Sequence, residues 1–290
     1  MTYCDILRKS ARMSGSCACI GLDPRMATLP PSLVPTGAGT GAATTVRASL
    51  VEFFSSLLTA VAQKELVPAA FKPNLGYWHC LDNPRQGEFA GSLALVDVLA
   101  LVEQLFPGIP IILDSKRGDI ASSSANYAEE AFTVWQAHAV TVSPYMGTDS
   151  VMPFVEEGTG EKGVYVLNRT SNPGAADLQG LVVEGSTGQE PLYLAVARQI
   201  VGATSSQELA HLAGFYADKD IPLLIPGVGS QGAGASATVQ LLKAAGYPVE
   251  LARINSSSGI TMPWKNTPAP SGWLDVCVKA WESLLKETSL

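Results

Sequence analysis

The chain has 290 residues, a formal net charge of −7 and five cysteines. It contains no dense run of lysine and arginine, which argues against nucleic acid or an anionic membrane surface as a partner. No signal-peptide core occurs within residues 1–14, and no window approaches the roughly 18 uninterrupted apolar residues of a membrane span. The cysteines lack framework spacing, so we expect reduced thiols in a cytoplasmic protein.

Apolar runs alternate with amphipathic segments through the first half of the chain. A helix at 3–13 and a strand at 17–22 precede a Gly- and Pro-rich stretch, about 29–45, which we expect to be a flexible loop. Residues 46–63 have apolar side chains at helical spacing. The pattern then predicts strands at 67–71, 109–113, 139–142 and 163–167, and helices at 92–106, 121–136 and 151–157.

The second half continues the alternation of strands and helices. It predicts strands at 200–204, 221–225 and 250–254, and helices at 191–198, 206–217, 235–245 and 273–287. Eight strands, each apolar throughout, indicate a parallel sheet covered by helices. Because each strand closes on polar residues, we predict a single-domain (β/α)8 TIM barrel over 1–290. In an open doubly wound sheet, only the strands near the switch point would carry a site.

The strand at 109–113 ends in Asp114, Lys116 and Asp119, separated by Ser115, Arg117 and Gly118. Side chains alternate along an extended backbone, so Asp114 and Lys116 should share one face. A strand end with solvated charges is the alternative interpretation. We favour a catalytic role, because α/β folds place reactive groups at the carboxyl ends of their strands.

Polar residues at the other strand ends would meet at the same mouth of the barrel. Lysines and aspartates confined there would keep one another ionised. A Gly-rich turn at 226–232 follows the seventh strand, where backbone N–H groups could hold a phosphate, although a plain tight turn is the alternative. The strand-end residues are Asp23, Lys72, Asp114, Lys116, Asp119, Ser143, Thr170, Ser171, Gln231 and Ser256 to Ser258.

Other catalytic motifs are weak in this chain. There is no GxSxG elbow, no HExxH motif and no GxGxxG after a first strand. The histidines His79, His138 and His211 are isolated from partners at metal-ligand spacing. We therefore predict no metal site.

Taken together, the strand ends resemble the orotidine 5'-phosphate decarboxylase family, in its longer-chain branch. The resemblance implies a barrel that acts without a cofactor, usually as a homodimer with shared active sites. It is carried in family order by Gly21-Leu22-Asp23-Pro24, Phe71-Lys72-Pro73-Asn74, Asp114-Ser115-Lys116-Arg117-Gly118-Asp119-Ile120, Ser143-Pro144-Tyr145-Met146-Gly147, Thr170-Ser171-Asn172-Pro173-Gly174 and Pro226-Gly227-Val228-Gly229-Ser230-Gln231-Gly232.

The resemblance also implies roles for individual residues. Lys116 would protonate C6 of the pyrimidine, and Asp114 would lie against the substrate carboxylate. Lys72 would complete the network, and Asp119 would reach into the partner subunit's site. The remaining roles are a ribose hydroxyl for Asp23, the base for Ser143, Thr170 and Ser171, and the phosphate for Gly227 to Gly229 and Gln231.

Two departures from the family pattern qualify this assignment. The family's phosphate-clamping arginine after the last strand is replaced by Ser258, which can donate one hydrogen bond but has no charge. We expect weaker phosphate binding unless Arg253, Lys265 or another cation compensates. Few residues separate the helix at 191–198 from the strand at 200–204, so the sixth strand is the least typical element.

Three functions follow from the sequence. The first is decarboxylation of orotidine 5'-phosphate to uridine 5'-phosphate in pyrimidine biosynthesis. The second, suggested by Ser258, is a family member that binds nucleotide with impaired catalysis. The third is another phosphosugar-barrel lyase, either metal-dependent or using Lys72 or Lys116 as a Schiff base. The intact Lys72, Asp114, Lys116 and Asp119 favour the first.

Overall fold

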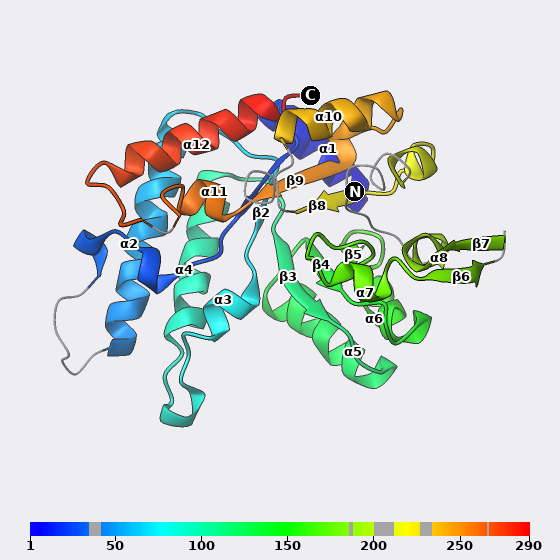
Figure 1. Ribbon diagram of the computed structural model, residues 1–290. Helices are drawn as coiled ribbons and strands as arrows, with labels where there is room; N and C mark the ends of the chain where they lie inside the picture. Colours follow the sequence, from blue (N-terminus) through cyan, green and yellow to red (C-terminus); the bar gives the residue numbers. More distant parts are fainter. Residues whose placement is uncertain (35–41, 186–187, 200–211, 227–233, 266) are drawn as a thin grey trace.

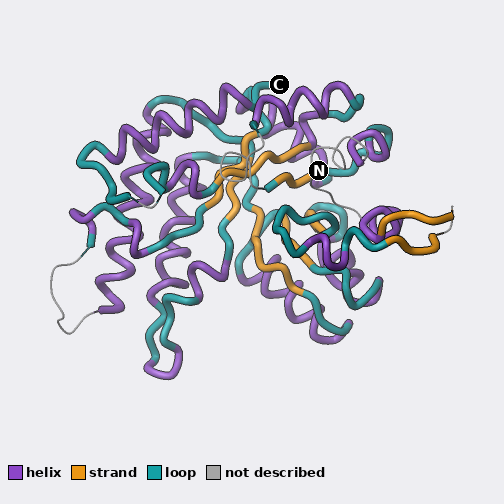
Figure 2. The backbone as a smooth tube through the Cα atoms, viewed as in Figure 1, coloured by secondary structure: helices purple, strands orange, loops and turns teal. Residues whose placement is uncertain are grey.

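The computed structural model describes residues 1–34, 42–185, 188–199, 212–226, 234–265 and 267–290 (Figure 1). Parallel strands gather at the centre of the molecule, and helices surround them (Figure 2). The parallel strands are β1 (Ala18–Gly21), β2 (Ala70–Lys72), β3 (Ile112–Arg117), β4 (Ala139–Val142), β5 (Gly163–Val166), β8 (Leu223–Ile225) and β9 (Ala252–Ser256).

The order of the strands is that of a barrel. One sheet runs β2-β1-β9-β8 and another β3-β4-β5, and the parallel bridges Phe71–Ile111 and Asn74–Asp114 join β2 to β3. Neighbours in space are thus neighbours in the chain, and the first strand pairs with the last. The strand predicted at 200–204, which would lie between β5 and β8, falls outside the described residues.

Helices follow most of the strands and cover the sheet from outside. Those of two turns or more are α1 (Tyr3–Ser14), α2 (Ala42–Gln63), α4 (Ala90–Leu105), α5 (Ala121–Glu129), α6 (Thr148–Gly158), α8 (Leu192–Gln199), α10 (Ala235–Ala244) and α12 (Trp273–Glu287). Shorter helical segments are α3 (Leu75–His79), α7 (Ala175–Leu178), α11 (Ser258–Thr261) and the 3-10 turns Met26–Thr28, Pro31–Leu33, Pro84–Gln86 and Val249–Leu251.

Local sequence accounts for the first helix. Thr2 and Asp5 form a capping box at its amino end, and Gly15 ends it with a left-handed φ of 66°. The buried Arg253 at the start of β9 donates hydrogen bonds of 2.7 Å to the Leu7 carbonyl and to Ser10 Oγ. Helix α1 is therefore fixed at the amino end of β9, opposite the carboxyl ends that carry the site.

Helix α2 is long and largely apolar. By length and composition its residues Thr45–Gln63 could cross a membrane. However, its apolar side chains are buried in the protein core, so packing explains its composition. The buried residues are Leu50, Phe53, Phe54, Leu57, Leu58 and Val61.

Several boundaries differ from those predicted. Strand β3 continues to Arg117 instead of ending at 113, with a register shift between Leu113 and Arg117. Helix α2 begins at Ala42, inside the expected loop 29–45, of which 35–41 lie outside the described residues. The helix expected to reach 136 gives way to a π-helical turn, Glu130–Val134.

An antiparallel hairpin was not predicted. It consists of β6 (Val182–Gly185) and β7 (Gly188–Pro191), which, among the strands of the described residues, pair only with each other. The hairpin extends from the barrel beside α8 (Figure 1). Of the helix predicted at 206–217, residues 212–217 are described: 212–216 are helical, and 217 lies in a turn.

Candidate active site

Asp114 forms the centre of a charged cluster at the carboxyl end of β3. Its Oδ2 atom lies 2.6 Å from Lys72 Nζ, at the end of β2, and its Oδ1 atom lies 2.6 Å from Lys116 Nζ. Thr141 Oγ1, from β4, donates a further hydrogen bond of 2.8 Å to Oδ1. Three adjacent strands thus place two ammonium groups and one hydroxyl around a single carboxylate.

The backbone around Lys116 explains how both charges reach the same place. Lys116 has a positive φ of 48°, an uncommon conformation for a residue with a side chain. Its N–H donates to Thr141 Oγ1 at 3.0 Å, within the irregular pairing of β3 with β4. The side chains of Asp114 and Lys116 therefore meet as the sequence predicted. However, the backbone at Lys116 departs from the regular extended conformation on which that prediction was based.

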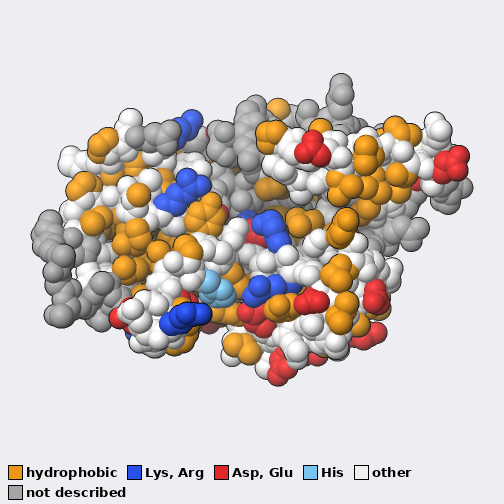
Figure 3. All heavy atoms as spheres, turned by 60° about the horizontal axis from the view of Figure 1, so that its bottom comes forward, with side chains coloured by type: hydrophobic (Ala, Val, Ile, Leu, Met, Phe, Trp, Pro, Cys, Tyr) orange, Lys and Arg blue, Asp and Glu red, His pale blue; other side chains and the backbone are white. Residues whose placement is uncertain are grey.

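The two lysines of the cluster differ in how far they are exposed to solvent. Lys72 is 4% exposed and Asp114 is 5% exposed, whereas the Lys116 side chain is 48% exposed. Lys72 is thus a fixed buried cation, while Lys116 extends into the open mouth of the site. The face onto which the strands open carries basic side chains beside acidic ones near its centre (Figure 3).

The cluster keeps its members ionised. Burial raises the pKa of Asp114, but Lys72 and Lys116 lower it by more, to about 2. Burial lowers the pKa of Lys72, and the charges of Asp114 and Asp23 outweigh this effect and raise it. The site therefore holds an alternating arrangement of cation, anion and cation at neutral pH.

Asp23 lies beside this cluster after β1. Its Oδ1 accepts a hydrogen bond of 3.2 Å from the Asn74 N–H, and the Leu22 N–H donates to the Lys72 carbonyl at 3.1 Å. These contacts fix the loops after β1 and β2 to each other. The structure thus brings together four of the predicted residues: Asp23, Lys72, Asp114 and Lys116.

Thr170 follows β5 and lines a cavity of about 80 Å³ with Lys72, Asp114 and Lys116. Gln179, just past α7, makes two hydrogen bonds with Thr170. Gln179 Oε1 accepts from the Thr170 N–H at 2.8 Å, and Gln179 Nε2 donates to Thr170 Oγ1 at 2.8 Å. The Thr170 hydroxyl in turn lies 2.7 Å from Asn172 Oδ1.

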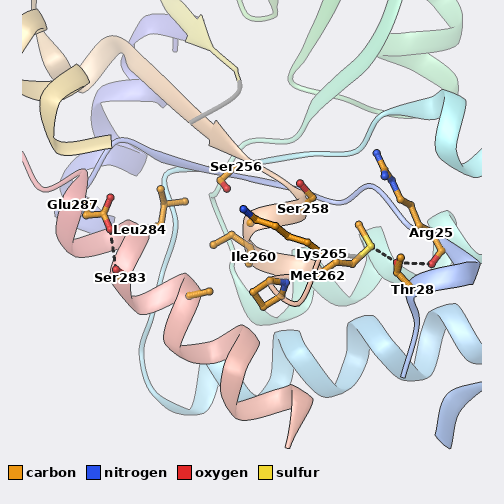
Figure 4. Close-up of a pocket in the computed structure, with 13 residues that line it drawn as sticks. Arg25, Thr28, Ser256, Ser258, Ile260, Met262, Lys265, Ser283, Leu284 and Glu287 are labelled. Carbon is orange, nitrogen blue, oxygen red and sulfur yellow. Dashed lines mark hydrogen bonds between the residues drawn. The ribbon is translucent and has the colours of Figure 1, made fainter. Parts of the chain in front are cut away.

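The other predicted residues are distributed around this centre. Ser143 is partly buried after β4, and Ser171 is exposed after Thr170. Asp119 makes no hydrogen bond to Lys72 or Lys116, and its Oδ1 accepts from the Ile120 N–H at 2.8 Å. Ser258 lines a different cavity, of about 500 Å³ (Figure 4). Gly227, Gly229 and Gln231 lie outside the described residues.

Two contributing residues were missed from the sequence. Thr141 lies within an apolar strand, so its pattern indicated core packing rather than a site. Gln179 lies nine residues beyond Thr170, and no periodicity links the two. Within the described ranges, no three His, Cys, Asp or Glu side chains are grouped as metal ligands.

The fold, with a carboxylate between two lysine ammonium groups at the carboxyl ends of its strands, is that of a barrel enzyme. Residues 85–249 match the profile of the "Orotidine 5'-phosphate decarboxylase / HUMPS family". The chain is 39% identical over 256 residues to an orotidine 5'-phosphate decarboxylase of Ralstonia pickettii, covering 83% of each chain. It is 40% identical to the protein of that name from Cupriavidus taiwanensis, over 83% of this chain and 82% of the relative.

Solved structures agree with these relatives. An orotidine monophosphate decarboxylase of Leishmania donovani superposes with a TM-score of 0.70 at 30% identity, covering 99% of both chains. A Toxoplasma gondii structure described as a putative decarboxylase of this kind gives a TM-score of 0.70 at 25% identity, over 98% of this chain and 97% of that one. The chain belongs to the orotidine 5'-phosphate decarboxylase family, and its fold is the (β/α)8 barrel of that family.

Proposed function

We propose that the protein is a carboxy-lyase that converts orotidine 5'-phosphate to uridine 5'-phosphate in pyrimidine biosynthesis, without a cofactor. The observation that supports this most directly is Asp114 held between Lys72 and Lys116, each at 2.6 Å. Relatives with this name match over 83% of the chain. An enzyme that lacks an electron sink must lower its barrier by charge placement, which this cluster provides.

The reaction breaks the bond between C6 and the carboxylate carbon, leaving the electron pair on C6 as CO2 departs. The exposed Lys116 ammonium stabilises this developing carbanion and then transfers a proton to C6. Asp114, fixed by buried Lys72, lies against the substrate carboxylate and favours its departure. Preorganised charges of this kind would supply much of a barrier reduction of about 20 kcal/mol.

The substrate would extend across the mouth of the barrel. In this proposal Asp23 and Lys72 contact the ribose, and Ser143, Thr170 and Ser171 face the base. Gly227, Gly229 and Gln231 would bind the phosphate after β8. Binding energy from the phosphate, remote from the reacting carbon, would hold the base against the charges.

We also propose a homodimer with shared active sites. Asp119 lies close in sequence to Lys116 yet makes no hydrogen bond or ion pair with Lys72 or Lys116 of its own chain. Three exposed apolar side chains lie near it, after β3 and β4: Ile120 (55% exposed), Tyr145 (82%) and Met146 (46%). Covering them with a second copy would bury apolar surface and bring Asp119 towards the partner's substrate.

We propose a cytoplasmic location for this activity. All five cysteines are free thiols, as is usual in reducing compartments.

The test follows the loss of orotidine 5'-phosphate absorbance in the presence of EDTA, for the wild type and for Lys116→Ala. We expect turnover by the wild type alone. Ser258 motivates one competing function, nucleotide binding with impaired catalysis, in which the wild type would bind uridine 5'-phosphate but fail to turn over substrate. Inhibition by EDTA, or trapping of substrate on Lys72 or Lys116 by borohydride, would instead identify another phosphosugar-barrel lyase.

A further inference from the structure

A second cavity, of about 500 Å³, lies at the carboxyl end of β9. Ser256 and Ser258 line it where β9 passes into α11, and Lys265 lines it from the loop after α11 (Figure 4). Gly259 also lines it, and a Cβ atom at this position would lie 2.8 Å from Ser256 Oγ. The absence of a side chain at Gly259 therefore keeps the Ser256 hydroxyl unobstructed.

Arg253, a candidate to replace the missing arginine, and Arg25, which lines the cavity, are both already engaged. Arg253 is fully buried and donates to the carbonyls of Leu7, Glu250 and Ala252 at the other end of β9. Arg25 lines the cavity, but its Nη2 atom donates to the Tyr77 hydroxyl at 3.0 Å, and its guanidinium carbon lies 5.5 Å from the centre of the Tyr77 ring. Neither is arranged to bind an anion beside Ser258.

Lys265 differs from both arginines. It is exposed, and among the described residues its ammonium has no ion-pair or hydrogen-bond partner. Its side chain extends back across α11 towards Ser256 and Ser258 (Figure 4). Glu287 is an acidic residue of the cavity wall, and its Oε1 accepts a hydrogen bond of 2.9 Å from Ser283 Oγ.

The loop that carries Lys265 is held in place. The Lys265 N–H donates to the Met262 carbonyl at 2.9 Å, and the neighbouring Trp264 Nε1 donates to the Thr28 carbonyl at 3.0 Å. Lys265 has a φ of 53°, in the left-handed region that residues with side chains rarely adopt. A strained conformation of this kind persists where surrounding contacts impose it.

We propose that Lys265 supplies the positive charge that holds the 5'-phosphate of the nucleotide, with the hydroxyls of Ser258 and Ser256 as hydrogen-bond donors. This inference rests on the proposed function, because it assigns the phosphate-binding cation of that site. A lysine ammonium acts on phosphate as a point charge, whereas an arginine guanidinium also fixes the orientation of the phosphate by two parallel hydrogen bonds. Here the hydroxyls of Ser258 and Ser256 would provide that orientation.

The experiment measures dissociation constants of uridine 5'-phosphate and of uridine by calorimetry. In Lys265→Gln we expect the nucleotide to bind about tenfold more weakly, because a charge-assisted hydrogen bond is lost, and the nucleoside to bind as before. Lys265→Arg should retain nucleotide affinity. Lys279→Gln, which removes an exposed lysine of α12 that does not line the cavity, serves as the charge-matched control.

A rescue variant separates charge from folding. Adding Ser258→Arg to Lys265→Gln should restore nucleotide affinity, since it places a guanidinium at the same cavity. Equal nucleotide affinity in the wild type and Lys265→Gln would overturn the proposal for Lys265 while leaving the decarboxylase function intact. A wild type that neither binds uridine 5'-phosphate nor turns over orotidine 5'-phosphate would instead overturn the proposed function itself.

Discussion

The Thr141 hydroxyl joins the backbone of Lys116 to the side chain of Asp114. It accepts a hydrogen bond of 3.0 Å from the Lys116 N–H and donates one of 2.8 Å to Asp114 Oδ1. A single side chain from β4 therefore fixes both the uncommon backbone of Lys116 and the orientation of Asp114. We propose that it positions the two groups that would act on the substrate.

Thr141→Val should reduce kcat by about tenfold to a hundredfold, as expected for losing a hydrogen bond to a charged group. Valine has nearly the same shape, so the core around β4 should remain packed. Steady-state kinetics give the result, with Thr141→Ser as the matched control that retains the hydroxyl. A valine variant with wild-type kcat would show that the hydroxyl does not position the cluster.

The ion pairs of Asp114 predict a specific response to acid. The pKa of Asp114 is about 2 in the folded protein, below the value of about 3.9 for an unfolded chain. A lowered pKa contributes stability above the unfolded value, and this contribution is lost as the pH falls from about 4 to about 2. We expect it to amount to roughly 2–3 kcal/mol of unfolding free energy.

Urea unfolding at a series of pH values tests this for the wild type and Asp114→Asn. The variant should be less stable at pH 7, because Lys72 is left buried without its counter-charge. It should also lose less unfolding free energy than the wild type between pH 4 and pH 2. Parallel curves for the two proteins over that interval would contradict the assignment of the acid response to Asp114.

The barrel and its charged centre could be predicted because both depend on local pattern. Apolar strands that end in Asp23, Lys72 and Asp114 bring these side chains together at one end of a barrel, and this does not depend on the exact backbone conformation of each strand end. The distortion at Lys116 could not be predicted, because its positive φ is imposed by pairing with β4 and not by its own sequence neighbours. The hairpin β6–β7 was missed for a similar reason: in the part of the chain that the structure describes, its strands pair only with each other, and they lack a buried apolar run.

Gln179 is expected to affect substrate binding more than chemistry. It makes hydrogen bonds with the N–H and the hydroxyl of Thr170, both at 2.8 Å, and it does not line the charged cavity. Gln179→Leu should raise the KM for orotidine 5'-phosphate about fivefold to tenfold, because the loop after β5 loses its anchor. The change in kcat should be smaller.

Gln179→Glu provides the graded control for this effect. Glutamate keeps an oxygen that accepts from the Thr170 N–H but lacks the amide donor, so its KM should fall between those of the wild type and the leucine variant. Thermal unfolding of all three proteins separates loop positioning from loss of fold. If KM in Gln179→Leu matched the wild type, the Thr170 loop would not depend on this anchor.

Shared active sites predict complementation between two inactive variants. Lys116→Ala removes the proposed proton donor, and Asp119→Ala removes the carboxylate proposed to serve the partner, so each homodimer should be inactive at both sites. In a mixed dimer one site would carry both substitutions and the other would carry neither. Random exchange of equal amounts should therefore restore about one quarter of wild-type activity, because half of the dimers are mixed and each has one intact site.

The measurement is decarboxylation after the two variants are unfolded together and refolded, with separately refolded samples mixed afterwards as the control. If the co-refolded sample were no more active than the control, Asp119 would lie in the site of its own chain or outside any site. The argument for shared sites across the surface of Ile120, Tyr145 and Met146 would then be lost.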